Sequence, residues 1–190
     1  MSETRRQAVL WRQLDALGLE HCRWSTEGDA PRVDGAVIVM DNGVPWRLEY
    51  DVRCDSAWRT RAVSVRAVAG ASDRTLALDA DANARWTVDG VARDDLFGCL
   101  DVDLGFSPAT NTLPIRRLGV RVGEQASIDV AWVEFPTLTI RRASQRYTRL
   151  TQSIYRFEYL SIDFVADIEV DANGLVVVYP GLWERTADSS

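Results

Sequence analysis

Hydrophobic and polar residues alternate with a period of two along most of this chain. Residues 46–54 place Trp46, Leu48, Tyr50, Val52 and Cys54 on one face, and every intervening residue is charged. Residues 162–170 repeat this pattern, and Asp171-Ala-Asn-Gly174 then provides a turn into residues 175–179. Because a strand with one buried face shows this alternation, both segments are expected to be strands, and the second is expected to form a hairpin.

Shorter alternating runs predict further strands in every part of the sequence. They lie near residues 33–40, 60–68, 74–79, 84–89, 99–104, 115–122, 127–134, 137–142 and 153–160. Only residues 1–17 and 93–97 could be helical, and the first of these also fits a strand through Val9, Trp11 and Gln13. The sequence therefore predicts an all-β, mainly antiparallel, many-stranded curved sheet. It would form a barrel, half-barrel or clam with at most a few short helices.

The length of 190 residues fits one domain, 1–190, in which residues 186–190 are expected to be a frayed tail. No apolar run approaches the roughly 20 residues needed to span a membrane, and no signal-peptide region follows the N-terminus, so we expect a cytoplasmic protein. The net charge of −6 disfavours nucleic acid and anionic membranes as partners. The oligomeric state is not indicated.

The composition also excludes several kinds of chemistry. All 22 basic residues are arginine, so neither a phosphate-loop lysine nor a lysine Schiff base is available. The three cysteines, Cys22, Cys54 and Cys99, are widely spaced and are expected to be reduced and mostly buried. One histidine, His21, and scattered cysteines give no zinc spacing. We therefore expect no metal, no cofactor and no catalytic triad.

The densest group of polar residues lies in one segment, residues 98–119. It contains an Asp-x-Asp pair on one face of a predicted strand, an asparagine in the following turn and two adjacent arginines. A hairpin would bring these groups together, and the arginines would keep both carboxylates ionised by lowering their pKa values. We expect a buried polar network or a binding site here, with Asp101, Asp103, Asn111, Arg116 and Arg117 as candidate ligand-binding residues.

A second candidate group begins at Arg59 and Arg61. In a regular strand these residues share a face with Val63 and Val65, which would place two guanidinium groups at the mouth of an apolar cavity. They could bind an anion or a sugar there, or they could simply pair with acids at the end of the sheet. Other candidates are tryptophans next to arginines and tyrosines of the C-terminal strands, namely Trp58, Trp86, Tyr147, Tyr155, Tyr159 and Tyr179, with Gln145.

Several of these motifs together resemble the bacterial glycolipid-binding family, formerly a domain of unknown function. The most specific block is Asn-Thr-Leu-Pro-Ile-Arg-Arg-Leu, and the resemblance covers nearly the whole chain. It implies a curved antiparallel sheet similar to the half-barrels of lipoprotein carriers, and a lipid or glycolipid ligand. It implies no catalytic residues. The matching segments are Gly18–His21, Trp58–Arg61, Gly98–Asp103, Thr110–Leu118, Gln145–Tyr147, Gly174–Val176 and Tyr179–Leu182.

Two functions are compatible with these features. The first is an intracellular binding protein that holds a glycolipid or other amphiphile in an apolar cavity with a mouth of arginine and aspartate residues. The second is a sugar- or lipid-processing hydrolase that uses Asp101 and Asp103, which a strand would hold about 6 to 7 Å apart. Because neighbouring arginines would leave this pair without a proton donor, we expect binding rather than catalysis.

Overall fold

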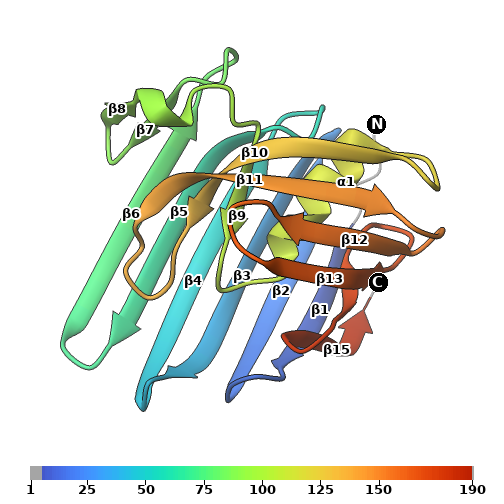
Figure 1. Cartoon of the computed structure of the whole chain (residues 1–190). Coiled ribbons are helices and arrows are strands. Elements are labelled where there is room, and N and C mark those ends of the chain that lie inside the picture. Colours follow the sequence, from blue (N-terminus) through green and yellow to red (C-terminus); the bar gives the residue numbers. More distant parts are fainter. Residues whose placement is uncertain (1–5, 190) are drawn as a thin grey trace.

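The structure is a computed structural model that describes residues 6–189 (Figure 1). Its fifteen strands form one continuous sheet in the order β8-β7-β6-β5-β4-β3-β2-β1-β15-β14-β13-β12-β11-β10-β9. Every neighbouring pair is antiparallel except β9 and β10, which are parallel. The strands of the first half are β1 (Arg6–Gln13), β2 (Gly18–Glu27), β3 (Ala30–Asp41), β4 (Val44–Cys54), β5 (Thr60–Ala69), β6 (Ser72–Ala80), β7 (Trp86–Val88) and β8 (Val91–Arg93).

The second half contains the helices and the remaining strands. The elements are the 3-10 helix η1 (Asp94–Leu96), β9 (Asp101–Leu104), the 3-10 helix η2 (Ala109–Asn111), α1 (Thr112–Leu118), β10 (Gln125–Val133), β11 (Ile140–Arg149), β12 (Ile154–Tyr159), β13 (Phe164–Val170), β14 (Val176–Tyr179) and β15 (Trp183–Ser189). No helix in the part of the chain that the structure describes is long and apolar enough to cross a membrane.

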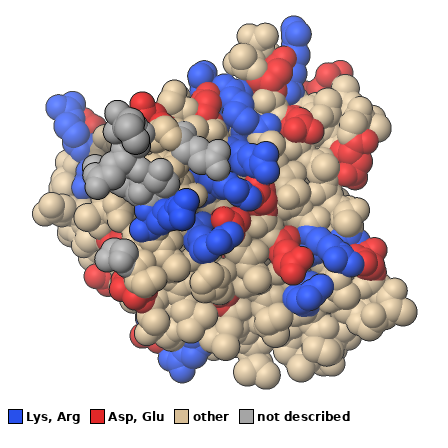
Figure 2. All heavy atoms as spheres, turned by 180° about the vertical axis from the view of Figure 1, so that it is seen from behind, with Lys and Arg blue, Asp and Glu red and all other residues tan. Residues whose placement is uncertain are grey.

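The long strands β1–β6 form a back layer whose two faces differ as the alternation predicts. Their inward residues are almost all buried and apolar. On the outer face, arginines and acids pair across neighbouring strands, as in Arg23–Asp34 and Arg66–Asp73. Figure 2 views the molecule from behind and shows basic and acidic side chains next to each other on this side. The polar positions of the pattern therefore face solvent.

The strands β10–β13 cross in front of the back layer, and the sheet bends between the layers at β1 and β15 (Figure 1). The edge strand β9 also approaches β5: the amide of Thr60 donates to the Leu100 carbonyl at 2.9 Å, and the amide of Val102 donates to the Thr60 hydroxyl at 3.1 Å. The sheet is strongly curved without closing into a barrel. This arrangement confirms the prediction of an all-β, mainly antiparallel curved sheet.

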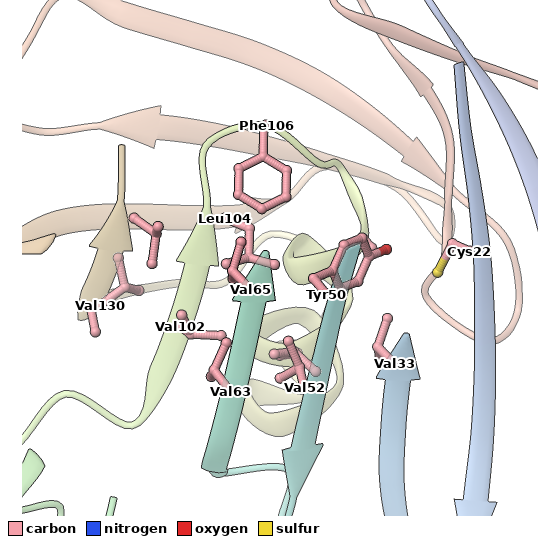
Figure 3. Close-up of a cluster of buried hydrophobic side chains, with 14 of the residues drawn as sticks. Cys22, Val33, Tyr50, Val52, Val63, Val65, Val102, Leu104, Phe106 and Val130 are labelled. Atoms are coloured by element: carbon pink, nitrogen blue, oxygen red, sulfur yellow. The ribbon is translucent and has the colours of Figure 1, made fainter. Parts of the chain in front are cut away.

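The space between the two layers is filled by side chains of the protein itself. Figure 3 shows Val52, Val63 and Val65 of the back layer facing Val102 and Leu104 of β9, with Phe106 above them. The segment that follows β9, residues 105–118, contributes further buried apolar residues. We call it the central segment; its buried apolar residues are Phe106, Pro108, Ala109, Leu113, Pro114 and Ile115.

Two local predictions for residues 98–122 were wrong. Residues 115–122 were expected to be a strand, but residues 112–118 form α1, which ends at Gly119 in the left-handed conformation (φ 57°). Pro114 lies in the first turn, where the missing N–H of proline does not interrupt a helical hydrogen bond. In addition, β9 pairs with β10 in parallel and forms no hairpin with the residues after it.

At the N-terminus, the structure shows the strand that the sequence offered as the alternative to a helix. Residues 6–13 are strand β1 rather than helix, and residues 94–96 form the short helix η1 that the sequence allowed. The strand β2 and the strand β15 were not predicted. β15 pairs with β1 as far as Ser189, so most of the expected C-terminal tail lies in the sheet. Residues 1–5 and 190 lie outside the described residues.

Candidate functional site

The central segment is bonded to the back layer through one buried carboxyl group. Glu20 of β2 is completely buried, and its Oε1 accepts hydrogen bonds from the hydroxyls of Tyr50 at 2.5 Å and Ser107 at 2.6 Å. Gly35 makes room for this contact, because a Cβ there would lie 2.6 Å from the Tyr50 hydroxyl oxygen. Burial raises the pKa of Glu20 to about 8, so the carboxyl is protonated at neutral pH.

A second buried carboxyl group fixes the end of α1. Asp101 of β9 is fully buried, and the Arg117 guanidinium donates to both of its oxygens. The Nη2–Oδ2 distance is 2.5 Å, and the arginine side chain is only 14% exposed. Burial raises the pKa of Asp101, although Arg117 acts in the opposite direction. This pair holds the helix against β9.

A third carboxyl group, Asp103, joins the central segment to the front layer. Gln145 of β11 donates to its Oδ2 at 2.6 Å, and the Thr110 hydroxyl donates to its Oδ1 at 3.3 Å. Beside it, the Tyr147 hydroxyl donates to the Asn111 side-chain oxygen at 3.0 Å. Burial raises the pKa of Asp103 to about 6, against the lowering effect of its two hydrogen bonds.

Asp103 also forms part of the wall of a hollow that opens between the central segment and the front layer. We call this hollow, of about 250 Å³, the aromatic pocket. Its polar lining residues are Asp103, Ser107, Asn111 and Arg141, and its aromatic lining residues are Trp132, Phe157, Tyr159, Phe164, Tyr179 and Trp183. Such a combination of aromatic walls with a few placed polar groups is typical of small-molecule sites.

One lining residue of the aromatic pocket, Tyr159, has a hydroxyl group without a hydrogen-bond partner in the described chain. The Tyr159 oxygen is buried and has no hydrogen-bond partner within residues 6–189. Burial raises the pKa of Tyr159. The positive charge of Arg141 lowers this pKa, and the negative charges of Asp103 and Glu134 raise it. The Arg141 guanidinium lies over the Trp132 ring, 4.4 Å from its centroid. A ligand hydroxyl in the pocket could satisfy this group.

The structure separates the predicted site residues into several places. Asp103 and Asn111 line the aromatic pocket, and Tyr147 lies directly behind it. Arg116 and Tyr155 line a different hollow, described below. Trp86 is buried, and its indole N–H donates to the Cys99 carbonyl at 2.9 Å. Trp58 stacks on Trp24 with ring centroids 6.2 Å apart. The ligand-binding roles of all these residues stay predictions.

Arg59 and Arg61 lie together at one end of the back layer. Both donate to the Asp55 carboxylate, at 2.9 and 2.7 Å, and neither lines the aromatic pocket. The expectation that both arginines share a face with Val63 and Val65 assumed a regular strand. In the structure Arg53 pairs with Ala62 and Cys54 pairs with Thr60, so Arg61 is the extra residue of a β-bulge. The bulge shifts the alternation, and the contacts observed are those of acid pairing at a sheet end.

The expected electrostatics of the Asp-x-Asp pair were wrong in one respect. The arginines were expected to lower both pKa values, but both are raised, because burial outweighs the ion pair at Asp101 and no arginine among residues 6–189 bonds to Asp103. The three cysteines are buried and free, as expected. Among the described residues, no cluster of three or more His, Cys, Asp or Glu side chains could hold a metal ion.

Several site residues were missed by the sequence reasoning. Trp132, Arg141 and Trp183 line the aromatic pocket but were not singled out. Glu20 was missed as well, although a signal existed: it shares a strand face with Cys22 and Trp24, so a carboxyl group stands in an apolar row. An acid at an inward position is a recognisable sign of a buried polar contact.

The buried pair predicts a large loss of stability in Asp101→Ala. The variant leaves the Arg117 guanidinium buried without its partner, and breaking a buried pair from one side typically costs about 3 to 5 kcal/mol. Urea unfolding, followed by tryptophan fluorescence, measures the change. Asp73→Ala removes an acid from an exposed arginine pair and serves as the matched control, with little effect expected. Equal stability of Asp101→Ala and the control would contradict the assignment.

Glu20 predicts a specific dependence of stability on pH. Its pKa rises from 4.5 to about 8 on folding, so the folded state binds the proton more tightly and loses stability as the pH rises between these values. The loss is at most about 5 kcal/mol, from 1.36 kcal/mol per pKa unit. Glu20→Gln cannot ionise, so its stability should fall much less from about pH 5.5 to about pH 8.5.

Urea unfolding at the two pH values tests this prediction. Glu49→Gln is the matched control, because Glu49 lies on the outer face of β4 with about half of its side chain exposed. The control should keep the pH dependence of the unsubstituted protein. The same dependence in Glu20→Gln would show that Glu20 does not titrate in this range.

Comparisons with known proteins agree with the observed fold. Residues 8–185 match the family described as "Putative glycolipid-binding". A crystal structure of a DUF1089 family protein from Pseudomonas aeruginosa superposes with a TM-score of 0.78 and 34% sequence identity, covering 97% of this chain and 93% of that chain. No curated protein matches the sequence significantly. The match over residues 8–185 confirms the resemblance seen in the motifs, and the chain belongs to this family.

Proposed function

We propose that the protein binds a glycolipid, or another amphiphile with a sugar headgroup, and that the aromatic pocket holds the sugar. The observation that carries this proposal is the buried Tyr159 hydroxyl, which has no partner in the described part of the chain and shares the pocket with Asp103. Sugars combine apolar C–H faces with hydroxyl groups. Aromatic rings suit the former, and a phenol and a carboxylate suit the latter.

The size of the pocket supports a single sugar ring rather than a whole lipid. Its volume of about 250 Å³ is slightly below the range of roughly 300 to 1,000 Å³ that is usual for small-molecule sites. The deeper space between the layers, where the sequence suggested an apolar cavity, is occupied by Phe106 and Leu113 of the central segment. We therefore place the hydrocarbon chain at the rim of the pocket and not in the interior.

The rim has the apolar surface that this arrangement needs. Ile162 and Leu182 line the outer part of the pocket, and Ile162 is 59% exposed. The amide of Leu14 donates to the Leu182 carbonyl at 2.8 Å, which brings the β1–β2 turn next to the pocket. Leu14 and Leu17 in that turn are also exposed. A hydrocarbon chain leaving the pocket could cover these residues.

A hydrolase that uses Asp101 and Asp103 is less well supported. Asp101 is bonded to Arg117 and does not line the aromatic pocket, so the two carboxyl groups do not flank one substrate position. Glu20 is protonated at neutral pH, but it is completely buried behind Ser107 and does not reach the pocket. We propose a binding protein without catalytic activity.

Binding of octyl glucoside below its micelle concentration tests the proposal. The protein should bind it more tightly than octanol, which has the same chain without the sugar, and tryptophan fluorescence reports the titration. Tyr159→Phe should weaken octyl glucoside binding about two- to thirteenfold, because one neutral hydrogen bond contributes about 0.5 to 1.5 kcal/mol. Tyr155→Phe is the matched control, since it removes a hydroxyl from the same strand outside the pocket.

Three outcomes would overturn the proposal. Equal affinity for octyl glucoside and octanol would show that the sugar is not recognised. Equal losses in Tyr159→Phe and Tyr155→Phe would place the sugar elsewhere. Release of glucose that disappears in Asp103→Asn would support the hydrolase instead.

A further inference from the structure

A second hollow lies at the other end of strands β12 and β13. It has a volume of about 280 Å³ and is formed by α1, the β11–β12 turn and the β13–β14 turn. We call it the arginine pocket, because Arg116 and Arg149 both line it, together with Tyr155, Gln152, Asp171 and Gly174. Tyr155 lines it from the same face of β12 that presents Phe157 and Tyr159 to the aromatic pocket, so the two hollows lie next to each other along this strand and share no lining residue.

Arg116 enters this pocket with no carboxylate partner in the described chain. Its guanidinium lies 5.1 Å from the centroid of the Trp58 ring, and no ion pair joins it to an acid within residues 6–189. Its stem packs on the β13–β14 turn, because a Cβ at Gly174 would lie 3.1 Å from Arg116 Cδ. The side chain is therefore positioned, and its N–H groups remain available.

Arg149 is fixed by main-chain carbonyl groups. It donates to the carbonyls of Val120, Thr151 and Gln152, and each of its three nitrogens makes one of these bonds. The two terminal nitrogens each keep a second N–H. Burial raises the pKa of Tyr155, while Arg149 and Arg116 lower it, so both positive charges act on the Tyr155 hydroxyl.

The acid in the pocket wall does not neutralise these two cations. The Asp171 Oδ2 accepts from Arg185 at 2.8 Å, and its Oδ1 accepts from the amides of Asn173 and Leu175. Most other arginines of the described chain are paired with a carboxylate, as in Arg121–Glu124. The arginine pocket is therefore lined by two guanidinium groups that have no carboxylate partner within residues 6–189.

We propose that the arginine pocket binds a phosphate group, either free phosphate or the phosphomonoester of a headgroup. Two guanidinium groups complement a dianion, and a phosphate oxygen can accept from several N–H groups at once. The Tyr155 hydroxyl adds a further donor. This site does not depend on sugar binding in the aromatic pocket, and either site could exist without the other.

Titration with inorganic phosphate, followed by NMR or calorimetry at low ionic strength, tests the proposal. Phosphate should bind saturably, and Arg116→Gln should weaken it at least tenfold. Arg121→Gln is the matched control, because Arg121 is exposed and pairs with Glu124 outside the pocket. Arg116→Lys should retain part of the affinity. Because Arg116 contacts the Trp58 ring but makes no side-chain hydrogen bond or ion pair within residues 6–189, Arg116→Gln should stay folded, which circular dichroism verifies.

Glycerol phosphate distinguishes the two sources of the anion. Tighter binding of glycerol phosphate than of inorganic phosphate, lost in Arg116→Gln, would identify a headgroup phosphomonoester. Equal binding of both would identify free phosphate. The absence of saturation by about 10 mM of either compound, or equal affinity of Arg116→Gln and Arg121→Gln, would overturn the proposal.

Discussion

The architecture depends on three carboxyl groups, two buried and one half-buried, that tie the central segment to the sheet on both sides. A carboxyl group in an apolar interior must be protonated, hydrogen-bonded or paired, and Glu20, Asp101 and Asp103 each meet this requirement with a different partner. Glu20 bonds to the central segment from the back layer, Asp101 bonds to the end of α1, and Gln145 of the front layer bonds to Asp103. These contacts fix one position of the segment between the layers.

This position determines where a ligand can bind. Because the central segment fills the interior, room for a small molecule remains where the segment ends against the front layer. The aromatic pocket lies at one end, with a carboxyl group and an unused phenol, and the arginine pocket lies at the other, with two unbalanced cations. The different chemistry of the two ends favours a sugar at the first and an anion at the second.

The sequence predicted those parts of the structure that depend on residues close together along the chain. Alternation predicted most of the long strands, although not β2, and the expected arginine partner of the Asp-x-Asp pair is present at Asp101, which pairs with Arg117. The pattern could not predict α1, because the four buried residues of this helix show neither a strand nor a helix period. It also could not predict the bulge at Arg61. The bonds of Asp103 and Glu20 join residues 42 and 87 positions apart, so their burial and raised pKa values arise only in the folded chain.

Hydrogen exchange of the amides of α1 tests most directly whether the central segment is a permanent part of the core. The measurement compares the free protein with the protein saturated with octyl glucoside. If the buried carboxyl groups fix the segment, its amides exchange only through global unfolding, and ligand does not increase their rate. An opening free energy for these amides well below the global free energy of unfolding, or faster exchange with ligand, would mean that the segment moves out to admit the hydrocarbon chain. Either result contradicts this account.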